Sequence, residues 1–379
     1  MHVSIFRTFA VLLLACVLPG LASTAFAATP AAPPPAFCPT CSIVFSHPKF
    51  DATGTLASST LSLVTASGTT NAIAPSVGVV IDNGPSWAPD GYRFAFVHGM
   101  SMSGTPQRFD ILSYDTRTRQ VRRMSYGPGN FTAATWGPHN RIAFLSKYRS
   151  GNCLSVIEAD GRQHDLFCPP QPAELRRPMW SADGRHLYVQ AGYYTGGLEP
   201  FWRSLAYRVN AATGAATRVD DRVLGEPMLL EFSPDGSRGI FYSPYPYTYE
   251  MTLVNFGTHG IRTLPYGYAP RWSKNSRRIA FTSEVYEINP PSVRYYEALF
   301  VMRADGTDVR RVTGSRVNNH ADTAVDWSRD GVHVLMNRRI YLDPSLTIPR
   351  YSMRKVNVDT GALHVLPDGF AEPGALFER

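Results

Sequence analysis

Short apolar segments alternate with tight-turn residues along most of this chain of 379 residues. No segment keeps a sustained 3.6-residue apolar period, so the pattern predicts strands and few helices. One unit recurs six times, 40 to 55 residues apart, and consists of an aromatic residue, a polar turn and a short apolar strand. The six copies begin at Trp87, Trp136, Trp180, Phe232, Trp272 and Trp327. This recurrence predicts a repeat architecture.

Each copy is followed by a strand, a turn and another strand, as in residues 299–313. A repeat therefore supplies about four short strands, and such a sheet buries both faces only by stacking against its neighbours. The sequence thus predicts an all-β fold, a β-propeller. Residues 42–46 and 61–64 suit the later strands of a further blade, and residues 372–377 suit its first strand. We expect seven blades over residues 42–379, with the ring closed by the C-terminal strand. A six-bladed ring with an extra hairpin is the alternative.

Residues 1–27 have the pattern of a signal peptide. Arg7 precedes an apolar run at residues 9–21, and small residues follow up to Ala27. The run is too short to cross a bilayer, and no other stretch of the chain approaches the length that a membrane helix needs. We therefore expect cleavage after Ala27, with residues 28–41 as a linker that contains a cysteine pair.

A second processing route stays open. The sequence Leu-Leu-Ala-Cys that ends at Cys16 resembles a lipobox, which would place a lipid on that cysteine. Cleavage there would leave residues 17–27 as an apolar tail without a purpose, so the first route is favoured. Either route exports the chain, and we expect a periplasmic or secreted protein without a transmembrane segment in its mature form.

The number of cysteines suits an oxidising compartment. Either cleavage leaves four cysteines in the folded part of the chain, and four allow three pairings. The four are Cys38, Cys41, Cys153 and Cys168. The hairpin signal Asp160-Gly161 lies midway between the last two, which predicts that they face each other and form a disulfide. The first two lack the strand-then-helix context of a redox pair, so a structural disulfide is favoured there also.

Composition narrows the class of protein. An apolar fraction of 44% and a charged fraction of 18% exclude intrinsic disorder. The 37 Lys and Arg residues exceed the 30 Asp and Glu residues, but no basic run occurs along the chain. We therefore expect no nucleic-acid partner.

The repeat resembles that of TolB-like β-propellers. The resemblance rests on the turn motif followed by Ile-Ala-Phe, as at residues 279–281, and on the strand and turn at residues 300–306. It covers residues 42–379 and implies a propeller fold. TolB itself carries an α/β domain before its propeller, for which this chain has no room, so the chain is TolB-like rather than TolB. The same repeat occurs in propellers of serine peptidases and in oligogalacturonate lyases, so it implies no single function.

The long loops of the predicted propeller should gather on one face and are rich in Tyr and Arg, which are common in recognition surfaces. They cover residues 47–59, 98–108, 193–202, 242–249, 284–296, 314–323 and 338–350. We predict a non-catalytic recognition module that binds an envelope protein or a glycan as a monomer, without metal or cofactor. The predicted ligand-binding residues are Tyr194, Trp202, Tyr245, Tyr247, Tyr268, Tyr286, Arg294, Tyr296 and His320.

Catalysis is the alternative hypothesis. The chain contains neither a Gly-x-Ser-x-Gly elbow nor a His-Glu-x-x-His motif. The enzyme would be a metal-dependent polysaccharide lyase of the oligogalacturonate type or another glycan-active propeller enzyme. The lyase resemblance would require a cluster of histidines around a metal, for which the chain offers His98 and His320 in predicted long loops, with Glu284 and Glu297 as companions. The Asp residues of the repeated turns suit backbone hydrogen bonding instead of catalysis. Whether the protein is an enzyme stays open, and a non-catalytic role is favoured.

Overall fold

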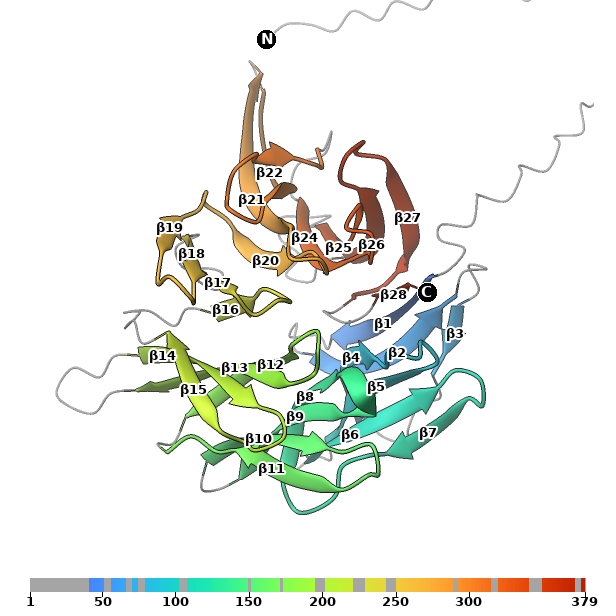
Figure 1. Cartoon of the computed structure of the whole chain (residues 1–379). Coiled ribbons are helices and arrows are strands. Elements are labelled where there is room, and N and C mark those ends of the chain that lie inside the picture. Colours follow the sequence, from blue (N-terminus) through green and yellow to red (C-terminus); the bar gives the residue numbers. More distant parts are fainter. Residues whose placement is uncertain are drawn as a thin grey trace, which may run out of the picture. The chain divides into compact units, whose positions relative to one another are not determined.

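β-Strands, paired mostly antiparallel, are the main regular structure of the described residues in this computed structural model (Figure 1). The structure describes residues 41–50, 56–65, 70–73, 79–101, 108–148, 151–170, 173–194, 202–220, 229–242, 250–289, 292–314, 320–340, 350–371 and 376–378. The predicted signal peptide, most of the linker and Cys38 lie outside these residues. Helical structure in the described part is limited to the 3-10 turn Pro138–Asn140, and no helix there is long and apolar enough to span a membrane.

The strands form five sheets. The first contains β1 (Cys41–Phe50), β2 (Leu56–Val64), β3 (Thr70–Ala72), β4 (Val79–Trp87), β5 (Arg93–Ser101), β6 (Arg108–Asp115), β7 (Gln120–Arg123) and β28 (Leu376–Glu378). The second contains β8 (Asn130–Trp136), β9 (Ile142–Tyr148), β10 (Gly151–Ile157) and β11 (Gln163–Phe167). The third contains β12 (Glu174–Trp180), β13 (His186–Tyr194), β14 (Trp202–Asn210) and β15 (Ala216–Asp220).

The remaining two sheets hold the C-terminal half. The fourth contains β16 (Leu229–Phe232), β17 (Arg238–Tyr242), β18 (Met251–Asn255) and β19 (Ile261–Thr263). The fifth contains β20 (Tyr268–Trp272), β21 (Arg278–Asn289), β22 (Ser292–Arg303), β23 (Arg310–Arg311), β24 (His320–Trp327), β25 (His333–Ile340), β26 (Arg350–Asn357) and β27 (Leu363–Asp368). In the first and fifth sheets, two four-stranded groups meet at a single parallel pair, Ser59 with Ile81 and Glu297 with Ala321.

The aromatic residue of each repeat ends the first strand of its four-stranded group and is buried against the preceding group. Three of the tryptophans also donate their indole N–H to a backbone carbonyl of that preceding group. The bonds join Trp180 to Thr135 (3.1 Å), Trp272 to Glu231 (3.2 Å) and Trp327 to Arg271 (2.9 Å). The tryptophans are therefore packing elements between successive groups, as the sequence predicts.

The turn after each aromatic residue is held by its own polar side chains. The Asp235 carboxylate accepts hydrogen bonds from the Ser237 backbone N–H (3.0 Å) and from the Ser233 hydroxyl (2.6 Å). Gly236 then takes φ +69°, a conformation that glycine adopts without steric cost. These contacts confirm the predicted structural role of the repeated Asp residues.

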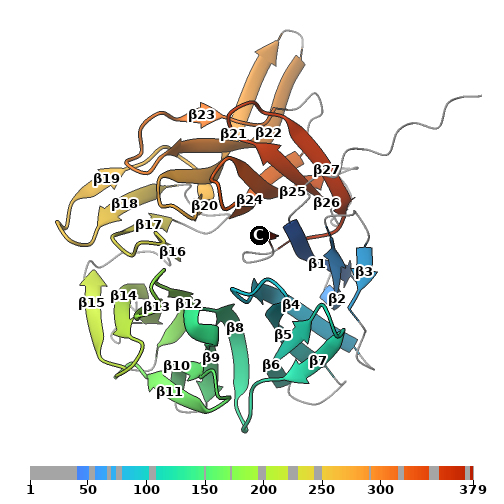
Figure 2. The ribbon, with the colours of Figure 1, turned by 45° about the vertical axis from the view of Figure 1, so that its right-hand side comes forward.

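Strands extend further into the predicted long loops than expected. The expectation of a loop at residues 284–296 is wrong, because β21 and β22 continue as paired strands up to Asn289 and Ser292. The residues there are mostly aromatic, β-branched or alternately polar, which suits a half-exposed strand better than a loop. Figure 2 shows the resulting hairpin extending past the neighbouring strands.

The predicted disulfide between Cys153 and Cys168 is present. A β-bulge between Leu154 and Ser155 shifts the pairing of β10 with β11 by one residue. Near the turn, Ile157 pairs with Gln163. Without the bulge, this register would place Cys153 opposite Phe167. The disulfide therefore depends on a bulge as well as on the turn signal.

The C-terminal strand β28 pairs antiparallel with β1, with Ile43 opposite Leu376 (Figure 2). Side chains of the first and fifth sheets also share one hydrophobic cluster. Its members are Ile43, Phe45, Val64, Val325, Leu335, Met353, Leu366, Ala371 and Leu376. The two ends of the described chain are thus packed together.

Candidate functional site

The hairpin formed by β21 and β22 places several predicted site residues on its two faces. Cross-strand pairing sets Glu284 opposite Glu297 and Tyr286 opposite Tyr295. Because side chains alternate between the faces of a strand, these four and Ile288 share one face. Tyr296 lies on the other face.

The end of that first face carries exposed apolar and aromatic side chains. Tyr286 is 62% exposed, Ile288 72% and Tyr295 37%, and the two tyrosine ring centroids lie 5.1 Å apart. We call these three residues the hairpin patch. Exposed large apolar groups that cluster at one place are typical of interaction sites.

Glu284 fixes both tyrosines of the hairpin patch. Its carboxylate oxygens accept one hydrogen bond from the Tyr286 hydroxyl (Oε2, 3.2 Å) and one from the Tyr295 hydroxyl (Oε1, 3.1 Å). The two rings are therefore held in position before any partner binds, which lowers the entropic cost of binding.

A buried acid lies below the hairpin patch on the same face. The Glu297 carboxylate accepts a hydrogen bond from the Tyr268 hydroxyl (2.7 Å) and lies 3.5 Å from the Arg339 guanidinium. Burial raises the pKa of Glu297, although Tyr268 and Arg339 act in the opposite direction. Burial and the neighbouring Glu297 also raise the pKa of Tyr268.

The position of Tyr268 comes from an irregular strand. Pairing of β20 with β21 shifts register between Tyr268 and Arg271, and Ala269 takes φ +48°. Such a bulge redirects the side chains next to it. It leaves the Tyr268 ring buried, so Tyr268 acts on the site through Glu297 and is not an exposed contact.

Tyr296 and His320 are buried on the other face of the hairpin, whereas the sequence placed them on a binding surface. Their rings stack at 5.1 Å with an interplanar angle of 15°. The Tyr296 hydroxyl donates to Glu287 Oε1 (2.7 Å), and Arg311 donates to both Glu287 (2.8 Å) and the Tyr296 hydroxyl (2.9 Å). These contacts brace the base of the hairpin. A direct role of either ring in binding stays a prediction.

The arginines of the predicted loops are similarly engaged. Arg338 makes two hydrogen bonds of 2.6 Å to the carboxylate of Asp322, which is fully buried. The Asp322 carbonyl in turn accepts a hydrogen bond from the Thr282 hydroxyl (2.9 Å). This bidentate pair joins β24 and β25 to the base of β21.

The other predicted site residues fall partly or wholly outside the described residues. Tyr194 and Trp202 are paired at the ends of β13 and β14, and Arg294 pairs with Glu287 in the hairpin, but their side chains are not described. Tyr245 and Tyr247 are wholly outside, and of the cysteine pair only the backbone of Cys41 is described.

Sequence reasoning missed the hairpin patch as a unit. It named Glu284 and Glu297 as companions of a metal, and it did not single out Ile288. The available signal was the alternation of residues 284–288, Glu-Val-Tyr-Glu-Ile, which predicts a strand with one exposed face.

A metal-dependent lyase would need a group of side chains that can hold a metal ion. Within the described ranges, the group of three His, Cys, Asp or Glu side chains close enough to hold an ion is Cys153, Asp165 and Cys168. Both cysteines are in the disulfide, so this group does not suit a metal. His98 and His320 belong to no such group in that part of the chain. A role of His98 and His320 as metal ligands therefore stays a prediction.

Comparison with known proteins identifies the fold. No protein-family model matches the sequence, and no curated protein matches it either. An oligogalacturonate lyase solved with manganese aligns with a TM-score of 0.57 and 14% identity, over 86% of this chain and 85% of the lyase.

A puromycin-hydrolysing peptidase from Mycobacterium tuberculosis aligns with a TM-score of 0.60 and 14% identity, over 87% of this chain and 52% of the peptidase. This chain thus spans about half of that peptidase. TolB from Acinetobacter baumannii aligns with a TM-score of 0.46 and 14% identity, over 88% of this chain and 82% of TolB, which is too loose for an argument. At these identities the likeness shows the fold alone, an all-β propeller.

Proposed function

We propose that this protein is an exported recognition module that binds a protein partner through the hairpin patch. The observation that carries the proposal is the exposure of Tyr286, Ile288 and Tyr295 on one face of a hairpin that extends past its neighbours (Figure 2). Tyrosine rings held by Glu284 offer large contact areas at little entropic cost.

Ile288, which lies on the same face as Tyr286 and Tyr295, favours a protein partner over a glycan partner. Ile288 is the most exposed member of the hairpin patch, at 72%. A branched aliphatic side chain gains from burial against apolar protein side chains, whereas sugar rings stack on flat aromatic faces. A glycan partner is therefore an outcome of the test, not the proposal.

The test replaces the hairpin patch and measures capture of a partner by cross-linking in the cell envelope. A variant with Tyr286→Ser, Ile288→Ser and Tyr295→Ser should lose one specific cross-linked protein. The control changes Tyr126→Ser, in the connection between β7 and β8, and Ile261→Ser, on β19, which are 56% and 60% exposed, and it should keep that cross-linked protein. Unfolding midpoints equal to wild type would show that the fold is intact.

Two results would overturn this proposal. Unchanged capture by the hairpin variant would remove the patch from recognition. The second result is that wild type forms no protein cross-link but binds a peptidoglycan fragment, and that the hairpin variant loses this binding. It would show that the partner is a glycan and not a protein.

We also propose the finer architecture on which this module rests. Seven blades follow if each four-stranded group is one blade, with β28 as the inner strand of the first. The pairing of β28 with β1 supports a ring closed in this way, over residues 42–379. Small-angle scattering of the mature protein would test both the closed ring and the proposed monomeric state.

Export is part of the same proposal. The signal pattern of residues 1–27 supports it, and the disulfide Cys153–Cys168 suits the periplasm or the cell exterior. Mass spectrometry of the exported protein would distinguish cleavage after Ala27 from a lipid on Cys16.

A metal-dependent lyase is the second candidate function. It is favoured by the shared fold with an oligogalacturonate lyase solved with manganese. Turnover of oligogalacturonate in the presence of manganese, lost in the variant with His98→Ala and His320→Ala, would establish it. Absence of turnover in the wild-type protein would remove it.

A further inference from the structure

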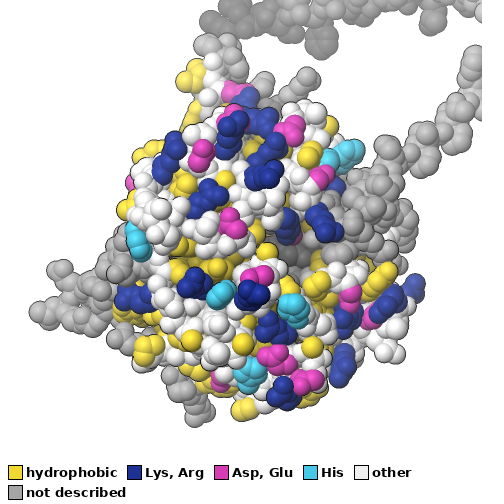
Figure 3. All heavy atoms as spheres, viewed as in Figure 1, with side chains coloured by type: hydrophobic (Ala, Val, Ile, Leu, Met, Phe, Trp, Pro, Cys, Tyr) yellow, Lys and Arg dark blue, Asp and Glu magenta, His cyan; other side chains and the backbone are white. Residues whose placement is uncertain are grey.

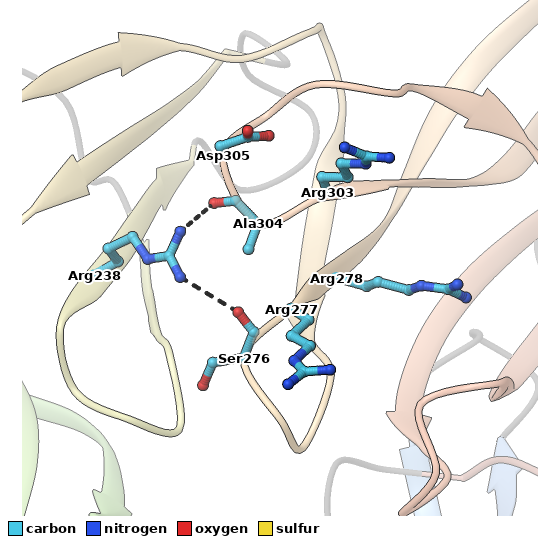
Figure 4. Close-up of a pocket in the computed structure, with 7 residues that line it drawn as sticks. All are labelled: Arg238, Ser276, Arg277, Arg278, Arg303, Ala304 and Asp305. Atoms are coloured by element: carbon cyan, nitrogen blue, oxygen red, sulfur yellow. Dashed lines mark hydrogen bonds between the residues drawn. The ribbon is translucent and has the colours of Figure 1, made fainter.

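A pocket lined by arginines opens at the end of the fifth sheet that is remote from the hairpin patch. It has a volume of about 450 Å³, within the range of small-molecule sites. Its lining residues are Arg238, Ser276, Arg277, Arg278, Arg303, Ala304 and Asp305 (Figure 4). We call it the arginine pocket.

The arginine pocket and the hairpin patch lie at opposite ends of the same two strands. Arg278 begins β21 and pairs with Arg303 at the end of β22. β21 has 12 residues, so roughly 35 Å of strand separate the pocket from the hairpin tip at about 3.3 Å per residue. The two sites can therefore be changed independently.

Four arginines and one aspartate line the arginine pocket, and Figure 4 shows the side chains of Arg278 and Arg303 extending away from Arg238. Figure 4 shows Arg238 reaching in from the neighbouring sheet, where it donates to the backbone carbonyls of Ala304 (2.8 Å) and Ser276 (3.4 Å). Arg238 and Arg277 form no ion pair with a carboxylate in the described part of the chain. A preorganised positive field inside a concave surface attracts anions.

Among the described residues, two of the four arginines have carboxylate partners, so the unpaired positive charge lies on Arg238 and Arg277. Arg303 lies 3.5 Å from the Asp308 carboxylate. Arg278 pairs with Asp359 (3.0 Å), but Arg310 shares the same carboxylate oxygen (2.6 Å). The Asp305 carboxylate is engaged by the backbone N–H (2.9 Å) and hydroxyl (2.6 Å) of Thr307. In Figure 3, Lys and Arg side chains gather over the region of the fifth sheet.

The repeated turn that lines the arginine pocket differs from the other copies, and this difference explains the excess of positive charge at the pocket. Asn275 holds the turn as Asp does elsewhere, by accepting from the Ser273 hydroxyl (2.8 Å) and from the Arg277 backbone N–H (3.1 Å). It carries no charge. At the equivalent turn of the third sheet, Asp183 lies 3.9 Å from the Arg185 guanidinium. Arg277, which follows Asn275 by two residues, therefore has no carboxylate of its own turn beside it, whereas Arg185 has Asp183.

The wall of the pocket is also fixed in position. Ser276 stands at φ +57°, where four of the other five copies have glycine, and its hydroxyl accepts a hydrogen bond from the Asp235 backbone N–H (3.1 Å). The Arg238 guanidinium lies 5.3 Å from the centre of the Trp272 ring. The fourth and fifth sheets thus both contribute arginines to the pocket, and Arg238 is held in place by its backbone and ring contacts.

We propose that the arginine pocket binds a small, multiply charged oxyanion, carried as phosphate groups or as the carboxylates of an acidic sugar. Arginine suits both, because its planar fork matches the oxygens of either group. This site is separate from the recognition function proposed above.

The test is calorimetric titration of the mature protein with pyrophosphate and with digalacturonate. The variant carries Arg277→Gln and Arg303→Gln. The control carries Arg185→Gln and Arg162→Gln, which removes the same charge from turns where the side chains are 82% and 80% exposed. Loss of charge-assisted hydrogen bonds should weaken binding in the variant about tenfold or more. The control should change by about twofold or less, because its arginines act only through screened charge.

The outcomes separate the ligand sources and the two proposals. Binding of pyrophosphate alone would indicate a phosphate-bearing ligand, and binding of digalacturonate alone a uronate. Equal weakening in variant and control, or no heat with either probe, would overturn the arginine pocket as a site. The hairpin-patch variant should bind the probes as wild type does, so failure of one proposal leaves the other intact.

Discussion

Glu297 shows how burial affects the charge of a single side chain next to the proposed recognition site. It is buried, it accepts from Tyr268, and the exposed tyrosines of the hairpin patch lie on the same face of the hairpin. Its raised pKa means that the folded protein holds this proton more tightly than the unfolded chain does. Stability from this group is therefore complete below the ordinary carboxyl pKa and is lost as the pH rises through the folded value.

Replacement of Glu297 by Gln should remove this dependence. The amide can still accept from Tyr268, but it does not titrate. We expect the free energy of unfolding of Glu297→Gln, relative to wild type, to rise with pH across that window, measured by denaturant titration. Glu250→Gln removes a carboxylate at an exposed position and is the matched control. A Glu297→Gln difference that is constant with pH would contradict the assignment.

The indole hydrogen bonds between successive groups offer a second test at the scale of a residue. Trp327→Phe leaves the Arg271 carbonyl without its donor, which costs about 1–3 kcal/mol beyond the lost ring contacts. The Trp136 indole N–H has no partner in the described chain, so Trp136→Phe loses ring contacts alone. Equal losses of unfolding free energy in the two variants would show that the bond contributes nothing.

At the scale of elements, the repeated turn was the most predictable feature. An aromatic residue followed by Asp-Gly specifies both a buried ring and a tight turn, because each is decided by neighbours in sequence. The bulges at Leu154 and Ala269 were not predictable, since they depend on pairing between strands. The hairpin patch was hidden for a similar reason. Which face of residues 284–288 is exposed depends on what packs against the other face.

The disulfide is the element whose contribution can be measured most directly. The variant with Cys153→Ser and Cys168→Ser should lose about 3 kcal/mol of unfolding free energy, the value expected for a loop with a sequence separation of 15 residues. Guanidinium titration with and without a reducing agent measures it. If the reducing agent still lowers the unfolding free energy of the variant, the predicted second disulfide, between Cys38 and Cys41, would account for the change. A variant as stable as wild type would contradict the expected contribution.

At the scale of the whole molecule, the all-β propeller fold followed from the period of the repeat, but its activity did not. The repeat specifies scaffold positions such as Trp272 and Asp235. The candidate sites lie where copies differ, at the long hairpin and at Asn275. A residue that differs from the other copies of the repeat follows no recurring pattern, so the sequence does not show which other residues it lies near. The structure shows which of these residues lie close together.

The junction between the first and fifth sheets should be sensitive to small losses of apolar volume. Leu376→Ala leaves a cavity in a cluster that joins both ends of the described chain, and we expect a loss of about 2–5 kcal/mol in unfolding free energy. Leu363→Ala, at a side chain that is 37% exposed, is the matched control and should change little. Similar losses in both variants would count against a structural role of β28.

The pairing of β28 with β1 has a consequence for biogenesis. β1 is made long before β28, so its edge stays open until residues 376–378 have been synthesised. A chain that terminates before β28 keeps that edge exposed to proteases and to other chains. Products truncated before β28 should therefore be degraded faster than chains that contain it.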